Sequence, residues 1–146
     1  MGFSLPGMHA FSQLTITNTT TAQALAQKLV GDGVTISNIS FTGNLLMAGF
    51  FNNTGGTNIN IDSGIVLTSG RAKTSDIFIG LDGNGSTAAQ SALANGMWGL
   101  PGDPDLAAAI GSPVSSLRDA CVLEFDFIPL GDSIKFKYVF SSIKFL

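Results

Sequence analysis

The chain has 146 residues, enough for one domain with its own hydrophobic core and too few for two domains of ordinary size. Hydrophobic residues make up 45% of it and charged residues only 12%, which excludes a disordered chain, since such chains combine high charge with few apolar groups. The formal net charge of −3 provides no basic surface for a nucleic-acid backbone, so we expect no nucleic-acid partner.

Two residue counts argue against most catalytic chemistry. The single cysteine, Cys121, permits neither an internal disulfide nor a cluster of zinc-binding thiolates. The single histidine, His9, lies outside every patterned segment, so a Ser-His-Asp triad or a Cys-His pair has no histidine to use.

No window of about 18 residues is both apolar and free of charges. We therefore expect a protein that is not an enzyme and that does not insert into a membrane.

The chain begins with a mostly apolar stretch, residues 1–10, that ends at the small Ala10. A secretory signal has a basic start, an apolar middle and a small-residue cleavage site, and only the last two are present. Residues 1–10 are therefore interpreted as a signal-peptide remnant or a disordered terminus. We expect residues 11–146 to form a single β-rich domain.

The first patterned segments predict a strand and a helix. Apolar and polar residues alternate over 14–17, as in a short strand. The segment 20–31 predicts a helix that opens with a capping box formed by Thr20 and Gln23. Gly31 suits the left-handed position after the last helical turn.

A slip in the alternation marks the next strand, 34–41. The apolar residues of its first half share one face of an extended chain, whereas those of its second half share the other. A bulge at Ser37 and Asn38 would return them to one buried face. Further short strands are predicted at 45–51, 58–61 and 65–67.

The region 71–117 carries weak strand signals and one clear helix start. Asp103 is suited to cap this helix, with Pro104 in its first turn and Gly111 at its end. The preceding part is expected to contain a turn cluster at 81–86, a helical turn at 87–94 and a loop at 96–101.

The last segments predict a β-hairpin. Apolar and polar residues alternate over 121–128 and again over 134–140, and a Pro-Leu-Gly-Asp turn at 129–132 separates the two runs. The aromatic residues of this hairpin that are expected to face the core are Phe125, Phe127, Phe136 and Tyr138.

The opposite face of the predicted hairpin carries charges of both signs. Asp126 is expected opposite Lys135, and Glu124 opposite Lys137, as two cross-strand ion pairs. The succession of short strands predicts an all-β fold, a β-sandwich or jelly-roll-like arrangement with one or two short helices.

Five motifs in chain order resemble the choice-of-anchor L domain family of bacteria. They are LTITNT at 14–19, GVTISN at 33–38, DSGIVLTSG at 62–70, PGDPDL at 101–106, and VLEFDFIP at 122–129 with YVFSS at 138–142. The resemblance implies an extracellular β-rich module, exported and then held by one of several C-terminal anchoring or sorting signals. The family pattern continues after Ser142 with Glu-Glu-Tyr and further strands, so we expect the domain to be incomplete at its C-terminal end.

Acidic residues provide candidate ligands for calcium, which takes about six to eight oxygen ligands. The alternative interpretation, which we favour, assigns 82–86 to an ordinary turn, Asp103 to helix capping and the two strand acids to lysine pairing. The calcium candidates are Asp82, Asn84, Asp103, Asp105, Asp119, Glu124 and Asp126.

Two further side chains have a functional and a structural interpretation. Trp98 is a candidate platform for a sugar ring, although an aromatic side chain in a loop more often covers the edge of a core. Cys121 begins a buried-looking strand and is expected to be a small core residue rather than a reactive thiol.

These features predict a non-catalytic structural or adhesive module of a secreted or cell-surface bacterial protein. The 134–140 strand is expected to leave an apolar edge open, through which the module can self-assemble. The expected partners are other surface proteins or copies of itself, with glycans as a further class. The alternatives are a calcium-dependent carbohydrate-binding module that uses Trp98, and a hydrolase that pairs Asp103 with Asp105 or Asp126.

Overall fold

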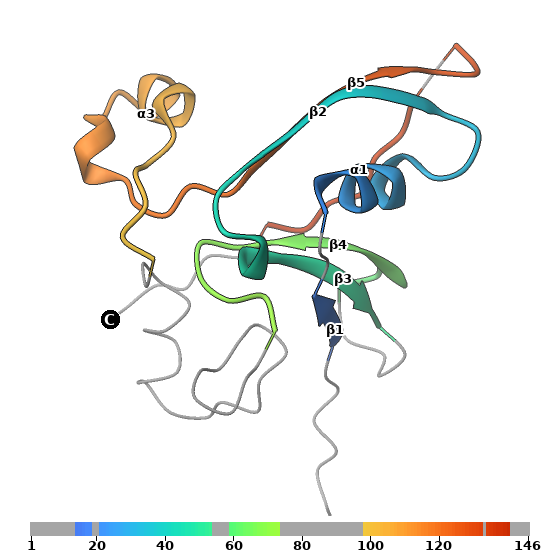
Figure 1. Ribbon diagram of the computed structural model, residues 1–146, viewed down its shortest axis with the longest axis horizontal. Helices are drawn as coiled ribbons and strands as arrows, with labels where there is room; N and C mark the ends of the chain where they lie inside the picture. The colour runs from blue at the N-terminus through green and yellow to red at the C-terminus, as the bar shows by residue number, and fades with distance from the viewer. Residues whose placement is uncertain (1–13, 19–20, 54–58, 74–97, 133, 141–146) are drawn as a thin grey trace, which may run out of the picture.

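Most of the regular secondary structure is β-strand. The computed structural model describes residues 14–18, 21–53, 59–73, 98–132 and 134–140 (Figure 1). The all-β class predicted from the sequence is confirmed, and so are its two short helices. The elements in chain order are β1 (Thr15–Asn18), α1 (Ala22–Val30), β2 (Thr35–Thr42), η1 (Leu45–Met47), β3 (Ala48–Asn52), β4 (Ser63–Leu67), α3 (Pro104–Ile110), η2 (Val114–Ser116) and β5 (Val122–Ile128).

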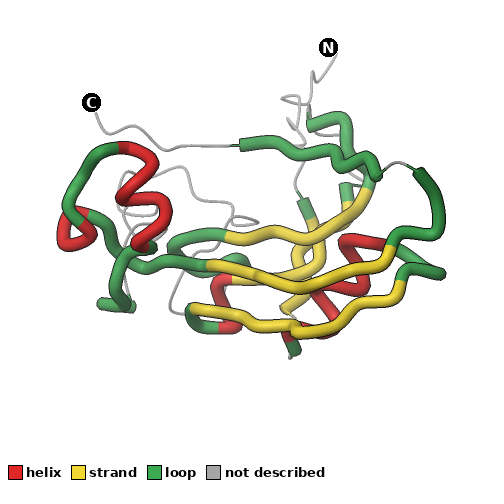
Figure 2. The backbone as a smooth tube through the Cα atoms, turned by 90° about the horizontal axis from the view of Figure 1, so that it is seen from above, coloured by secondary structure: helices red, strands yellow, loops and turns green. Residues whose placement is uncertain are grey.

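The strands form two antiparallel sheets. One sheet has the order β1-β3-β4, with Ile16 opposite Phe51 and Phe50 opposite Ile65. The other pairs β2 with β5, which lies far away in the sequence. Figure 2 shows the strands of both sheets as extended tubes, and both views place α3 at one end of the molecule.

Helix α1 packs against both sheets and supplies the centre of the core. It contacts β2 and β5 on one side and β3 and β4 on the other, and lies between the two sheets in Figure 1. Leu25 and Ala26 are completely buried there. The other buried apolar residues in the described part of the chain are Ile16, Met47, Ala48, Ala72 and Ala107.

The ends of α1 agree with the prediction only in part. Thr21, whose backbone is extended, is the N-cap, and its hydroxyl accepts a hydrogen bond from the Ala24 amide at 3.2 Å. The cap therefore falls one residue after the predicted Thr20, which lies outside the described residues, and N3 is Ala24, whose methyl side chain cannot complete the predicted capping box. Gly31 ends the helix with a positive φ of +78°, which glycine accommodates readily, but its ψ of −171° differs from the predicted left-handed helical conformation.

The predicted bulge in β2 is confirmed. Ser37 lies opposite Asp126 and Ser40 opposite Glu124, so two residues of β2 face one residue of β5. Asn38 takes up the extra length with a φ of +50°, a conformation that asparagine tolerates better than most residues. As a result Ile36 and Ile39 are both half-buried on the side that faces α1.

Two of the predicted strands are corrected. The run 45–51 begins with the 3-10 helix η1, because the Asn44 side chain accepts a hydrogen bond from the Leu46 amide at 2.9 Å and turns the chain before β3. Residues 59–61 belong to no strand, and the φ of +53° at Asn60 interrupts an extended backbone. The strand predicted at 65–67 is confirmed as β4.

The predicted C-terminal hairpin is wrong. Residues 134–140 form no strand, and β5 pairs with β2 instead. Phe127, Phe136 and Tyr138, which were expected in the core, are exposed by 40%, 47% and 86%. The pattern identified β5 correctly as a strand, but alternation is a local signal and does not select the neighbouring strand.

Helix α3 is confirmed with both of its predicted ends. The Asp103 carboxylate accepts a hydrogen bond from the Leu106 amide at 2.6 Å, Pro104 is in the first turn, and Gly111 ends the helix with a φ of +66°. The helical turn predicted at 87–94 lies outside the described residues. Within the described ranges, neither α1 nor α3 has the length and apolar character needed to span a membrane.

Candidate functional site

A buried carboxyl group fastens the loop before α3 to the segment that leads into β5. Asp119 is 1% exposed and has a φ of +52°. Its Oδ1 accepts a hydrogen bond from the Leu100 amide at 2.7 Å, and its own amide donates to the Leu100 carbonyl at 2.9 Å. A backbone bridge between Pro101 and Arg118 continues this contact. We call this contact between 98–104 and 117–120 the loop crossing.

The second carboxyl oxygen of Asp119 marks the loop crossing as unusual. Oδ2 is buried and has no hydrogen-bond partner in the described part of the chain. An unsatisfied buried acceptor costs about 1–3 kcal/mol, so Asp119 combines one strong contact with one unfavourable group. A cavity of about 120 Å³ lies beside the crossing, lined by Thr42, Gly43, Leu100, Pro101, Gly102, Asp103, Pro104 and Ala120.

Among the described residues, the other calcium candidates do not join Asp119 in a metal-binding group. Asp103 uses a carboxylate oxygen to cap α3, and Asp105 is exposed in the first turn of that helix. Across the residues that the structure describes, no group of three or more His, Cys, Asp or Glu side chains is placed to hold a metal ion. Asp82 and Asn84 lie outside the described residues.

The two strand acids have polar partners on β2. The Asn38 amide donates to Asp126 Oδ2 at 2.5 Å, and the Ser40 hydroxyl donates to Glu124 Oε2 at 3.3 Å. The predicted pairing of these acids with lysines across a hairpin is therefore wrong. All four side chains lie on the exposed face of the β2–β5 pair, opposite the face that packs on α1.

Trp98 packs against the residues that follow β4. Its Nε1 donates to the Gly70 carbonyl at 3.5 Å, and the Arg71 guanidinium lies 5.0 Å from the centroid of its ring. The guanidinium of Arg71 therefore covers one face of the half-buried Trp98 ring. A sugar would have to displace this guanidinium or bind to the other face of the ring.

Cys121 behaves as a partly buried apolar residue. Its thiol donates a weak hydrogen bond to the Met47 carbonyl at 3.8 Å. Burial raises the pKa of this thiol from the ordinary 9.0 to about 11, although a backbone hydrogen bond at Thr68 opposes the shift.

We expect alkylation of Cys121 by iodoacetamide at pH 8 to be about 100-fold slower in the native protein than in urea. A thiol pKa that is two units higher lowers the thiolate fraction at pH 8 by about that factor, and the thiolate is the form that reacts. The raised pKa means that the folded state holds the proton more tightly. This contribution to stability is complete below pH 9 and is lost as the pH rises towards 11. Equal alkylation rates in the two states would show that the thiol is not buried.

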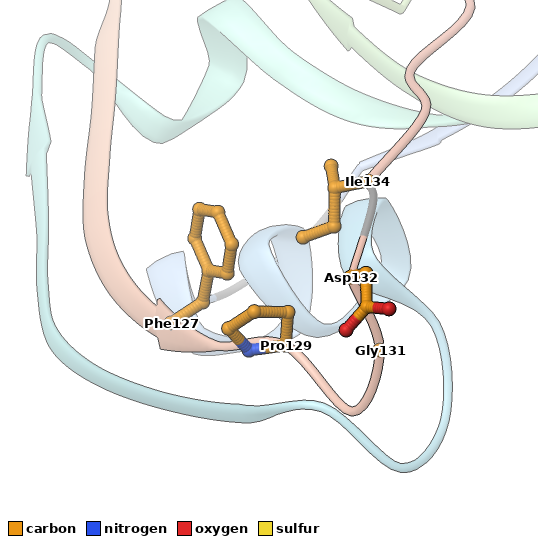
Figure 3. A pocket seen from close by; sticks show the side chains of 5 residues that line it. All are labelled: Phe127, Pro129, Gly131, Asp132 and Ile134. Carbon is orange, nitrogen blue, oxygen red and sulfur yellow. The ribbon is translucent and has the colours of Figure 1, made fainter.

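Apolar side chains are exposed at the end of β5 and in the segment after it. Figure 3 shows Phe127 and Ile134 on opposite sides of a cavity of about 90 Å³, with Pro129, Gly131 and Asp132 completing its lining. The large apolar side chains exposed here, which we call the C-terminal apolar surface, are Phe127, Ile128, Leu130, Phe136, Tyr138, Val139 and Phe140.

Sequence reasoning predicted an open edge at 134–140 but not the exposure of its aromatic side chains. It interpreted every alternation of apolar and polar residues as one buried and one exposed face, and so it assigned the aromatic residues of 134–140 to the core. The detectable signal was the low charge of the chain combined with many phenylalanines near the C-terminus.

The comparisons with known proteins agree with the resemblance found in the sequence. Residues 13–146 match the Choice-of-anchor L domain family, and the chain therefore belongs to this family. Membership marks it as a bacterial surface-associated module. Neither the curated proteins nor the solved structures gave a match.

Proposed function

We propose that this choice-of-anchor L domain is a non-catalytic structural or adhesive module, outside the cell or on its surface, that makes contacts through its C-terminal apolar surface. The exposure of Tyr138 by 86% and of Phe140 by 85% is the observation that carries the proposal. Contiguous exposed apolar patches on soluble domains mark interaction sites, because leaving such side chains in water costs free energy that a partner can recover.

Attachment of cells that display the domain tests this function. The double variant Tyr138→Ser, Phe140→Ser is expected to lose most of the attachment that the domain confers, with the fold retained because both side chains are exposed. The control is Leu106→Ser, Ile110→Ser, which removes a similar exposed apolar pair on a different element, α3. If both variants attach as well as the wild type, the C-terminal apolar surface is not the contact site.

Calcium binding is the second candidate, and the buried Asp119 Oδ2 is the observation in its favour. The main proposal needs no metal, so the melting temperature is expected to be the same in EDTA and in millimolar calcium. A calcium ion bound only by the folded state would stabilise it by about 2.7 kcal/mol at a hundredfold excess over Kd. A calcium-dependent rise that disappears in Asp119→Asn would support the calcium alternative.

Carbohydrate binding and hydrolysis receive less support. Binding of a sugar at Trp98 has to compete with Arg71, and the carboxylates proposed for a hydrolase already have other partners at Asp103 and Asp126. Glycan-array binding that is lost in EDTA would favour the first alternative. Turnover of a glycan that is lost in Asp103→Asn would favour the second.

A further inference from the structure

Strand β5 has one edge that no described strand occupies. β2 pairs with one side of β5 from Val122 to Ile128, and the sheet ends there in the part of the chain that the structure describes. The backbone N–H and C=O groups along such an edge can accept another antiparallel strand. Glu124 and Asp126 give the exposed face beside this edge a negative charge.

The segment 134–140 has the sequence of a strand but pairs with none of the described strands. Ile134, Phe136, Tyr138 and Phe140 alternate with Lys135, Lys137 and Val139, which is the period of an extended chain with one apolar face. Nevertheless the segment belongs to neither sheet, and all of its side chains except Ile134 are exposed. In Figure 1 it leaves the tip of β5 and runs back towards β4.

The charges on this segment complement those on β5. In an antiparallel pairing that places Lys135 opposite Asp126, the next position on the same face places Lys137 opposite Glu124. The same register places Phe136 beside Phe125, so apolar side chains meet on the other face. A shift by one residue would place lysines against apolar side chains, so the register is well defined.

We propose that the segment 134–140 of one copy of this chain adds as a strand to the free edge of β5 in a second copy, and that the second copy reciprocates. This inference rests on the proposed function, since it names the partner of the C-terminal apolar surface. The pairing is the same in both directions, so it closes into a dimer with two-fold symmetry. It pairs the free edge of β5 in both copies and neutralises their exposed acids.

The favoured partner is a second copy because the segment of the same chain is directed away. After the turn at 129–132 the chain departs from β5 instead of folding back along it. A segment delivered from outside can approach the free edge without reversing that turn.

Charge reversal and mixing test the proposal with the full chain. Sedimentation of the wild type from micromolar to near-millimolar concentration is expected to show a mass of twice 15.1 kDa at the upper end. The variant Lys135→Glu, Lys137→Glu is expected to remain monomeric, and so is Glu124→Lys, Asp126→Lys. An equimolar mixture of the two is expected to dimerise, because each copy then offers the other complementary charges at both pairings.

Each result decides the matter. A wild type that is monomeric throughout, or a lysine-reversed variant that dimerises as well as the wild type, would overturn the proposal. A mixture that stays monomeric would overturn it as well, because the complementary charges on the two variants would then have failed to join two copies. If circular dichroism shows that the reversal on β5 unfolds the chain, Glu124→Gln, Asp126→Asn replaces it, with weaker dimerisation than the wild type expected.

The inference and the proposed function can fail separately. Dimerisation by the mixing test, together with cell attachment that is insensitive to Tyr138→Ser, Phe140→Ser, would retain the dimer and reject the adhesive contact. A monomeric wild type whose attachment is lost in that variant would retain the contact surface and reject the second copy as its partner.

Discussion

Leu25→Ala is expected to lower the free energy of unfolding by about 2–5 kcal/mol, a cost typical of emptying a leucine site in a close-packed core. Leu25 is 0% exposed and lies on the helix that contacts both sheets. Its removal would leave a cavity between α1 and the strands, and the two sheets would lose part of their common packing. Urea denaturation followed by circular dichroism measures the change.

The control for Leu25 is the same substitution on the same helix at Leu29, which is 37% exposed. Leu29→Ala is expected to cost less than about 1.5 kcal/mol, because less apolar surface is removed from a partly hydrated site. If the two variants lose equal stability, α1 does not present Leu25 to the sheets in the way the structure shows.

The parts of the fold that could be predicted depend on short stretches of sequence. The Asp103 cap, the turn at Gly111 and the bulge at Ser37 and Asn38 each depend on residues a few positions apart. Hydrogen bonding between a side chain and a nearby amide needs no knowledge of the rest of the chain. Such features are therefore visible before any tertiary structure is known.

The pairing of β5 depends on residues that are remote in sequence. Ser37 lies opposite Asp126, and nothing in either segment selects the other over the nearer run 134–140. The preference arises from the shared apolar surface of α1, which both β2 and β5 contact. Because this surface exists only once the helix has docked, sequence periodicity alone favours the short hairpin connection.

The candidate site divides in the same way. The capping role of Asp103 follows from local sequence, whereas the burial of Asp119 follows from the packing of the loop before α3 against the chain before β5. Aspartate tolerates the left-handed backbone found at position 119, but many aspartates in turns do so without being buried. Its distinctive feature, an oxygen shielded from water without a partner, is a property of the assembled loop crossing.

Gly102→Ala tests that crossing, and its expected cost is about 3 kcal/mol, at the upper end of typical overpacking effects. Gly102 is buried, and an added Cβ would overlap the Leu117 Cβ and lie 2.8 Å from the Leu117 carbonyl carbon. Two of the three close atoms belong to the backbone, so the strain cannot be relieved by a side-chain rotation. The chain segments themselves have to separate.

Gly131→Ala is the matched control, because its added Cβ meets no atom within 4 Å and its backbone is not left-handed. This variant is expected to change stability by no more than about 1 kcal/mol, and to raise it if the loss of freedom in the unfolded chain dominates. Separation of the crossing in Gly102→Ala should also break the hydrogen bond from the Leu100 amide to Asp119. The Leu100 amide hydrogen should then exchange faster with solvent. A Gly102→Ala variant as stable as Gly131→Ala, with a slowly exchanging Leu100 amide, would mean that the two segments are not in contact at Gly102.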